Sequence, residues 1–146
     1  MTTYSGNIKT TVLNRHERYF ALENGAVLPI DAWLDEHGRH CSPDVAVIAM
    51  YKLRSDDRYR GVDLRMFADA NGNEATKEPY RDDIQCTAVN LRNKFFRMTD
   101  DTVIAFNTIN INEAPIAIVE LPNGAFRCVD LRLFTVDHPD MIEVLH

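Results

Sequence analysis

The chain has 146 residues, of which 45% are hydrophobic and 26% are charged, and its formal net charge is −6. This is the composition of a globular protein, and a chain of this length buries enough surface to fold without disulfides or metals. No apolar run approaches the roughly 18 residues of a membrane helix, and the N-terminus lacks the apolar core of a signal peptide. The composition therefore predicts a soluble cytoplasmic domain and excludes collagens, coiled coils and secreted disulfide scaffolds.

The charge balance bears on the class of partner. Residues 74–146 hold 12 acidic and 7 basic side chains, whereas residues 1–73 hold 10 acidic and 9 basic. Proteins that bind nucleic acids usually carry a basic surplus, so a protein partner is favoured over a nucleic acid, and no membrane contact is expected. The cysteines Cys41, Cys86 and Cys128 have no paired spacing, which indicates reduced thiols rather than disulfides.

Alternating apolar residues, separated by turn residues, predict a series of strands. In chain order we expect a strand at 8–13, a hairpin at 19–30, a hairpin at 45–67 with its turn at 55–57, a strand at 103–111 and a hairpin at 116–134. The first and last hairpins turn at Asn24-Gly25 and Asn123-Gly124. Asn-Gly pairs supply the positive φ angles that a tight hairpin turn requires.

Two segments allow more than one interpretation. Residues 29–38 suit either a short helical turn or a strand end followed by a loop. In residues 81–98 the spacing of apolar residues suits one face of a helix, whereas the β-branched residues favour a strand. Periodicity does not separate these alternatives, so we expect at most one helix, near residues 81–97.

An internal repeat is the most informative feature of the sequence. Residues 60–67 read R-G-V-D-L-R-M-F and residues 127–134 read R-C-V-D-L-R-L-F, which gives six identical positions in eight at an offset of 67. Upstream, residues 46–53 and 114–121 share four positions at an offset of 68. Two matching blocks in the same order predict an internal duplication, with one residue lost in the turn between them.

The duplication defines the expected organisation of the chain. Residues 1–146 form a single compact domain made of two pseudo-repeats, at about 8–67 and 80–134. The loop at 68–79, which contains an Asn-Gly pair and a proline, joins the two repeats. A weaker match at an offset of 69, carried by three residues between 22 and 31, extends the repeat into the first hairpin.

These elements predict a fold that is mainly β, either all-β or a β-rich α+β fold. Antiparallel hairpins with an internal duplication would form a small barrel-like structure or two packed sheets. Over the hairpins alone, the alternation of turns and strands resembles that of small SH3-like barrels.

The repeated Asp-x-Arg pairs are candidates for a ligand or partner groove. Asp63, Arg65, Asp130 and Arg132 alternate with apolar residues, so we expect them on the solvent face of their strands, aspartate beside arginine. If the halves pack about a pseudo-twofold axis, these faces would meet at a shared groove. Trp33 is expected to be a core residue or an anchor in that groove.

The segment after Trp33 is the candidate for a metal site. His37, His40 and Cys41 lie within five residues of one another, and all three residue types bind zinc or other transition metals. Their spacing matches no standard zinc pattern, and the sequence has no Cys-x-x-Cys pair. We therefore expect no cofactor, with a transition metal such as zinc at this loop as the alternative.

The sequence has no nucleophile elbow, phosphate loop or metalloprotease motif, which argues against an enzyme. It favours a non-catalytic binding or interaction module of bacterial or phage accessory type, whose hairpins offer edges to a protein partner. The first alternative is a small enzyme, or a ligand- or metal-binding barrel, that uses the loop Trp33–Cys41. A weaker alternative is an acidic decoy for a nucleic-acid-binding enzyme. Exposed edge strands also allow a homodimer.

Overall fold

The computed structural model describes residues 2–4, 10–22, 24–52, 57–68, 74–77 and 84–135. The predicted loop at 68–79 and the predicted turn at 55–57 lie partly outside these ranges. The elements of the first half are β1 (Thr2–Tyr4), β2 (Thr10–Asn14), β3 (Tyr19–Leu22), β4 (Val27–Pro29), β5 (Ala32–Leu34), β6 (Ile48–Lys52), β7 (Tyr59–Asp63) and the 3-10 helix η1 (Leu64–Met66). Those of the second half are β8 (Ile84–Asn90), β9 (Phe95–Met98), β10 (Val103–Ile111), β11 (Ala114–Glu120), β12 (Phe126–Asp130) and the helix α1 (Arg132–Thr135).

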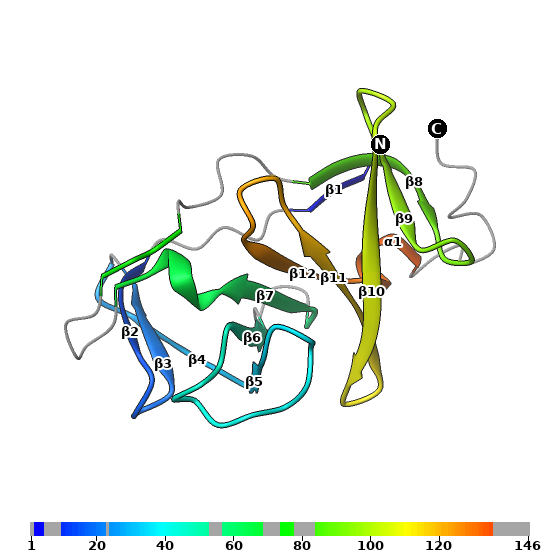
Figure 1. Cartoon of the computed structure of the whole chain (residues 1–146). Coiled ribbons are helices and arrows are strands. Elements are labelled where there is room, and N and C mark those ends of the chain that lie inside the picture. The colour runs from blue at the N-terminus through cyan, green and yellow to red at the C-terminus, as the bar shows by residue number, and fades with distance from the viewer. Residues whose placement is uncertain are drawn as a thin grey trace.

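All the strand pairs are antiparallel, and the predicted mainly β fold of antiparallel hairpins is confirmed. Nine strands form one sheet in the order β1-β8-β9-β10-β11-β12-β7-β6-β5, and β2, β3 and β4 form a second sheet. The first and last strands of the large sheet are not neighbours, so the sheet is not closed into a barrel. Figure 1 shows β2–β6 on one side of the adjacent strands β7 and β12, and β8–β10 on the other side, where β1 pairs with β8.

Strands β7 and β12 join the two halves edge to edge. Their register pairs Gly61 with Cys128, and on either side it pairs Val62 with Arg127 and Arg60 with Val129. At the offset of 67, Arg60 corresponds to Arg127 and Val62 corresponds to Val129. Each of the two β7 residues therefore pairs with the counterpart of the other. The order of strands is also the same in both directions from it, with β6 and β5 on one side and β11 and β10 on the other. A local twofold axis thus passes between Gly61 and Cys128.

The outer hairpins of the two halves, β2–β3 and β8–β9, also correspond. Each contains a β-bulge in its first strand. Each turn ends in a residue of positive φ, 66° at Arg18 and 56° at Lys94. The carbonyl oxygens of these residues accept the N–H groups of Ile30 and Phe106, each at 3.0 Å. These positions lie 76 residues apart, so the offset of 69 suggested by the sequence is wrong for this hairpin; a longer connection before β6 changes the offset.

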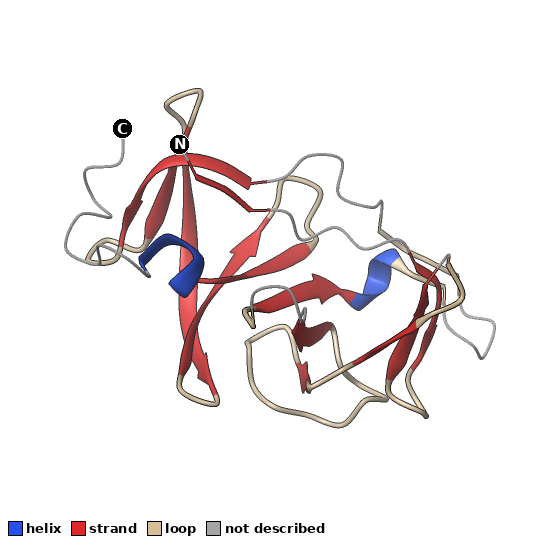
Figure 2. Ribbon diagram, turned by 180° about the vertical axis from the view of Figure 1, so that it is seen from behind, coloured by secondary structure: helices blue, strands red, loops and turns tan. Residues whose placement is uncertain are grey.

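Each central strand ends at an aspartate that is followed by about one helical turn. The Asp63 carboxylate accepts the N–H of Arg65 at 2.9 Å, and the Asp130 carboxylate accepts the N–H of Arg132 at 3.0 Å. The strands predicted to continue to residues 67 and 134 stop here, because the capping carboxylate favours the helical turn over an extended chain. Figure 2 shows the two short helices in blue, one in each half. In the described ranges neither helix has the length and apolar character of a membrane span.

Three apolar clusters form the core of the protein. The first-half core contains Leu13, Phe20, Trp33, Tyr51, Val62 and Leu64, and the second-half core contains Val89, Phe96, Phe106, Val119, Val129 and Leu131. A third cluster, with Leu34, Ile48, Met50, Ile116, Ile118 and Cys128, draws residues from both halves. Successive residues of β6 and of β11 belong to different clusters, as expected for strands that are covered on both faces. All five residues of β7 are also buried.

The helix alternative for residues 81–97 is wrong over the described residues 84–97, which form β8, β9 and the turn between them. A β-bulge in β8 shifts the alternation of buried and exposed residues by one position. As a result Cys86 and Val89, three residues apart, are both buried. The spacing that suggested a helical face included Leu91, which instead lies in the turn between β8 and β9 and is 40% exposed.

Candidate functional site

A groove of about 700 Å³ runs along β10 in the second half. The residues that line it are Val103–Ile109 of β10, Ile118, Glu120, Leu121 and Pro122 at the end of β11 and in the following turn, Phe126 of β12, and Glu36 and His37. We call this feature the β10 groove. Glu36 and His37 belong to the loop between β5 and β6, so one wall of the groove comes from the first half.

The loop that supplies this wall is a clear difference between the two halves. Residues 35–47 connect β5 to β6, whereas only two residues connect β10 to β11. Gly38 of the loop, with a φ of 80°, lies against the second half. A Cβ atom at this position would stand 2.7 Å from Cδ1 of Ile118 and 3.2 Å from Cγ2 of Ile109. The loop approaches the sheet this closely because glycine has no side chain and tolerates a positive φ.

Asp35 fixes the conformation of the loop. Its Oδ1 accepts the N–H of Arg39 at 2.9 Å and that of His37 at 2.8 Å. These backbone hydrogen bonds, the one from Arg39 foremost, lower the pKa of the Asp35 carboxyl. The turn presents Glu36 and His37 at the groove, where their side chains are 64% and 65% exposed and Glu36 Oε1 lies 3.5 Å from His37 Nε2.

Strand β10 changes partners along the groove. Val103–Ala105 pair with β9, whereas Phe106–Ile111 pair with β11. In the part of the chain that the structure describes, each of these stretches therefore has a strand partner on one side only. An edge without a strand partner presents backbone N–H and C=O groups that another chain can bind. Pairing with β11 stops at Phe106, and the groove continues beyond that residue.

The structure places the first Asp-x-Arg pair beside the groove. Asp63 is 0% exposed, so the interpretation of a carboxylate on the solvent face is wrong. It accepts hydrogen bonds from Nε of Arg65 at 3.0 Å and from Nη2 at 2.7 Å, and these raise the pKa of the guanidinium. The Asp63 carboxylate also accepts the backbone N–H of Phe126, from the other half, at 2.8 Å. The Arg65 guanidinium lies 5.6 Å from the centre of the Phe126 ring.

The second Asp-x-Arg pair has the same geometry. Asp130 is 0% exposed and accepts hydrogen bonds from Nε and Nη2 of Arg132, at 3.0 Å and 2.7 Å. It also accepts the backbone N–H of Tyr59, from the first half, at 2.9 Å. Each aspartate thus binds the arginine of its own half and the backbone of the other half. The two pairs lie at opposite ends of the β7–β12 junction, and the structure does not bring them together.

Trp33 lies in the first-half core, where it is 5% exposed. It is not among the residues that line the β10 groove. Of the two roles expected for Trp33, its position supports the one in the core. Its indole N–H has no hydrogen-bond partner within the described ranges.

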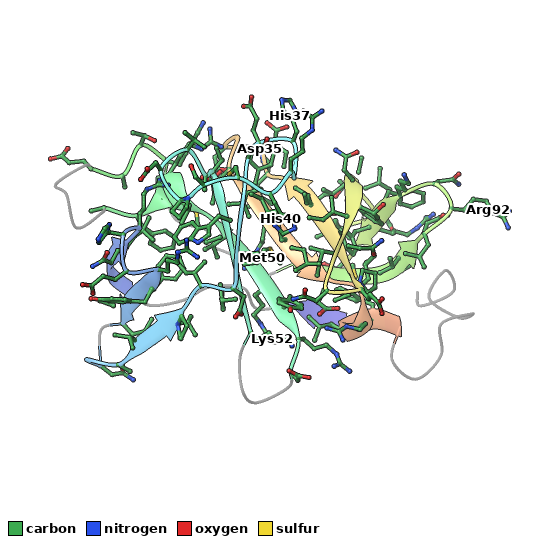
Figure 3. All side chains as sticks on the ribbon, turned by 90° about the horizontal axis from the view of Figure 1, so that it is seen from below. Asp35, His37, His40, Met50, Lys52 and Arg92 are labelled. Carbon is green, nitrogen blue, oxygen red and sulfur yellow. The ribbon has the colours of Figure 1, made fainter. Side chains whose placement is uncertain are left out.

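The candidate metal ligands do not converge. Within the described ranges, no group of three or more His, Cys, Asp and Glu side chains is placed to hold a metal ion. Figure 3 shows His37 and His40 at separate places along the loop. The N–H of Cys41 donates to the carbonyl oxygen of Trp33 at 3.1 Å, and burial, followed by the Asp35 carboxylate, raises the pKa of the Cys41 thiol. The geometry therefore gives no support to the zinc alternative at this loop.

We expect the cysteines to differ in their reaction with a thiol reagent. Burial raises the pKa of Cys86 to about 11 and also raises that of Cys128, whereas Cys41 is only partly buried. Thiolate is the reactive form, so at about pH 8 the folded protein should be labelled at Cys41 alone, and faster as the pH rises. Mass spectrometry of the labelled chain checks this, with the urea-unfolded chain as the control that labels at all three sites. Labelling of Cys128 in the folded chain would contradict its burial.

Sequence reasoning missed Val103, Glu120 and Phe126, which line the groove. Val103 begins β10 and is 58% exposed. A closer alignment of the two repeats would have found part of the site, because residues 35–47 stand out as an insertion. No sequence signal marks the wall formed by β10, β11 and β12, because these residues line a groove only where the loop 35–47 packs against them.

Comparison with protein-family models, with curated proteins and with solved structures finds no match to this chain. The geometry of the β10 groove and the chemistry of its walls are therefore the basis for a functional interpretation.

Proposed function

We propose that this chain is a non-catalytic interaction module that binds an extended segment of a protein partner along the β10 groove. The observation that carries this proposal is the loop at 35–47, which places Glu36 and His37 at the sheet of the second half. A duplicated scaffold by itself offers two equivalent surfaces. The loop adds a wall to one of them and so distinguishes a single binding face.

The shape of the groove suits an extended occupant. Seven consecutive residues of β10, Val103–Ile109, line it. An extended peptide beside seven residues spans about 20 Å and places every second side chain on the same surface. The edge of Val103–Ala105, beyond the end of the pairing with β11, can supply main-chain hydrogen bonds to such a peptide, and pockets for alternate side chains can supply specificity.

The side chains of the groove supply apolar contact with a few polar groups. Val103, Ile109, Ile118 and Phe126 contribute apolar surface, and Asn107 contributes an amide. Contact areas of this composition are typical of sites that hold peptides or small ligands. No step of bond making or breaking is needed to account for the arrangement.

A matched pair of variants tests the proposal. Val103 in β10 and Val27 in β4 occupy corresponding positions of the two halves, and each is 58% exposed. We expect the immobilised wild-type chain to enrich peptides from a random display library. The enriched peptides should bind Val103→Arg at least about tenfold more weakly than wild type, because a long charged side chain would occupy the groove. They should bind Val27→Arg as they bind wild type.

Fluorescence polarisation with a labelled peptide gives the dissociation constants, and thermal unfolding shows whether both variants are folded. Equal binding to wild type and to folded Val103→Arg would place the peptide elsewhere and overturn the proposal. The same would follow if the library yielded no enriched sequence.

A small molecule is the second candidate occupant, favoured by the groove volume. At about 700 Å³, the groove falls within the roughly 300–1,000 Å³ typical of small-molecule sites. Native mass spectrometry of gently purified, untagged protein would show such a ligand as additional mass that is absent from Val103→Arg.

A further inference from the structure

The charged carboxylates at the β10 groove come from both halves of the chain. Glu36 lies on the loop of the first half and Glu120 ends β11 in the second. Both are exposed. Both line the groove with Phe126, whose ring centre lies 5.6 Å from the Arg65 guanidinium. The hydrogen bonds that Arg65 donates to Asp63 are the main cause of its raised pKa, and the charges of Glu36 and Glu120 add to it.

Arg65 does not neutralise these two carboxylates. Its Nε and Nη2 bind the buried Asp63 carboxylate, and Nη2 also donates to the carbonyl oxygen of Gly124 at 3.1 Å. Arg65 and Asp63 together form a neutral unit. Both side chains of the His37–Glu36 contact are exposed to solvent, and exposed ion pairs contribute little free energy. The charge of Glu36 and Glu120 therefore remains available to an occupant.

The negative charge belongs to the groove rather than to the repeated scaffold. The first-half residue that corresponds to Glu120 is Lys52, at the offset of 68 that relates β6 to β11. Lys52 Nζ lies 3.3 Å from Oδ1 of Asp57 and 4.8 Å from the centre of the Tyr59 ring. Figure 3 shows Lys52 and His37 at opposite ends of the view. The two halves thus carry opposite charges at the same position.

From this charge distribution we infer that the segment bound in the β10 groove carries a lysine or arginine next to apolar residues. The inference rests on the proposed function and specifies its partner. Apolar residues of the segment contact Val103 and Phe126, and the basic side chain lies between the carboxylates of Glu36 and Glu120. A basic group placed there gains two opposite charges, whereas an acidic group would meet two like charges.

The peptide library selected on wild type provides the first test. Enriched sequences should contain lysine or arginine beside apolar residues more often than the unselected library. The best peptide is then measured against the double variant Glu36→Gln/Glu120→Gln, which keeps the shape of both side chains and removes their charge. Its dissociation constant should rise at least about fivefold, with Glu113→Gln, an exposed glutamate outside the groove, as the control variant.

Salt dependence gives an independent readout. Binding to wild type should weaken as the salt concentration rises, because salt screens exposed charges, and binding to the double variant should change little. Enriched peptides without a basic residue, or an unchanged dissociation constant for the double variant, would overturn the inference. If those peptides still required Val103 for binding, the proposed function would stand and only the inference about the basic residue would fail. Peptides that bind independently of Val103 would overturn both.

Discussion

Replacing Asp63 with alanine should lower the free energy of unfolding by about 3 kcal/mol, and replacing Asp130 should lower it by about the same amount. Each buried carboxylate accepts hydrogen bonds from three N–H groups of its own arginine and from one backbone N–H of the other half. Its removal leaves those donors without this acceptor. The expected loss is at the low end for a buried pair, because each arginine side chain is 34% exposed to water.

Urea unfolding followed by the fluorescence of Trp33, the one tryptophan of the chain, measures these losses. The exposed Asp44 provides the control, since Asp44→Ala should leave the unfolding free energy within about 0.5 kcal/mol of wild type. A small effect of Asp63→Ala and Asp130→Ala would mean that the carboxylates do not hold the junction. A large effect of only one of them would mean that the two ends of the junction are energetically unequal.

Gly61→Ala should destabilise the chain by about 3 kcal/mol, because the β7–β12 junction has no room for a methyl group there. A Cβ atom at Gly61 would stand 2.5 Å from Cβ of Cys128 and 2.5 Å from Sδ of Met50. The Met50 side chain can move, but Cβ of Cys128 is fixed to the opposite strand. The two central strands would have to shift apart, at the cost of their paired hydrogen bonds.

The compensating change distinguishes this clash from a general loss of backbone freedom. Cys128→Gly should destabilise the wild-type chain by leaving a cavity. In the presence of Gly61→Ala it should instead recover part of the lost stability, because it removes the atoms that the new methyl group meets. A double-mutant cycle in urea measures this coupling, which should favour the pair by about 1–2 kcal/mol. Strictly additive effects would rule out steric conflict at the axis.

The strands were largely predictable from the sequence. The structure has β3 at Tyr19–Leu22 and β10 at Val103–Ile111, with the bounds that alternation and turn residues indicate. The turn glycines Gly25 and Gly124 have φ angles of 84° and 81°, as Asn-Gly turns require. These features are local, so a short stretch of sequence determines them.

The environment of the central strands was not predictable in the same way. A period of two shows that Asp63 and Asp130 lie on the other face from Val62 and Val129, but not whether that face is covered. Both carboxylates are buried, and the Asp63 and Asp130 side chains accept the N–H groups of Phe126 and Tyr59, residues that are distant from them in the chain. The β10 groove depends equally on a distant contact, the seating of Gly38 against Ile118.

The local twofold axis between Gly61 and Cys128 bears on how such a protein can evolve. In a dimer of identical subunits, the residue at the axis meets its own copy, so two cysteines would collide here and two glycines would leave a void. A single chain encodes the two sides separately, and here one side chain fills a space that only one can occupy. The same independence lets Lys52 and Glu120 carry opposite charges at matching positions. Because one polypeptide contains both halves, the surface of each half can evolve its own binding specificity.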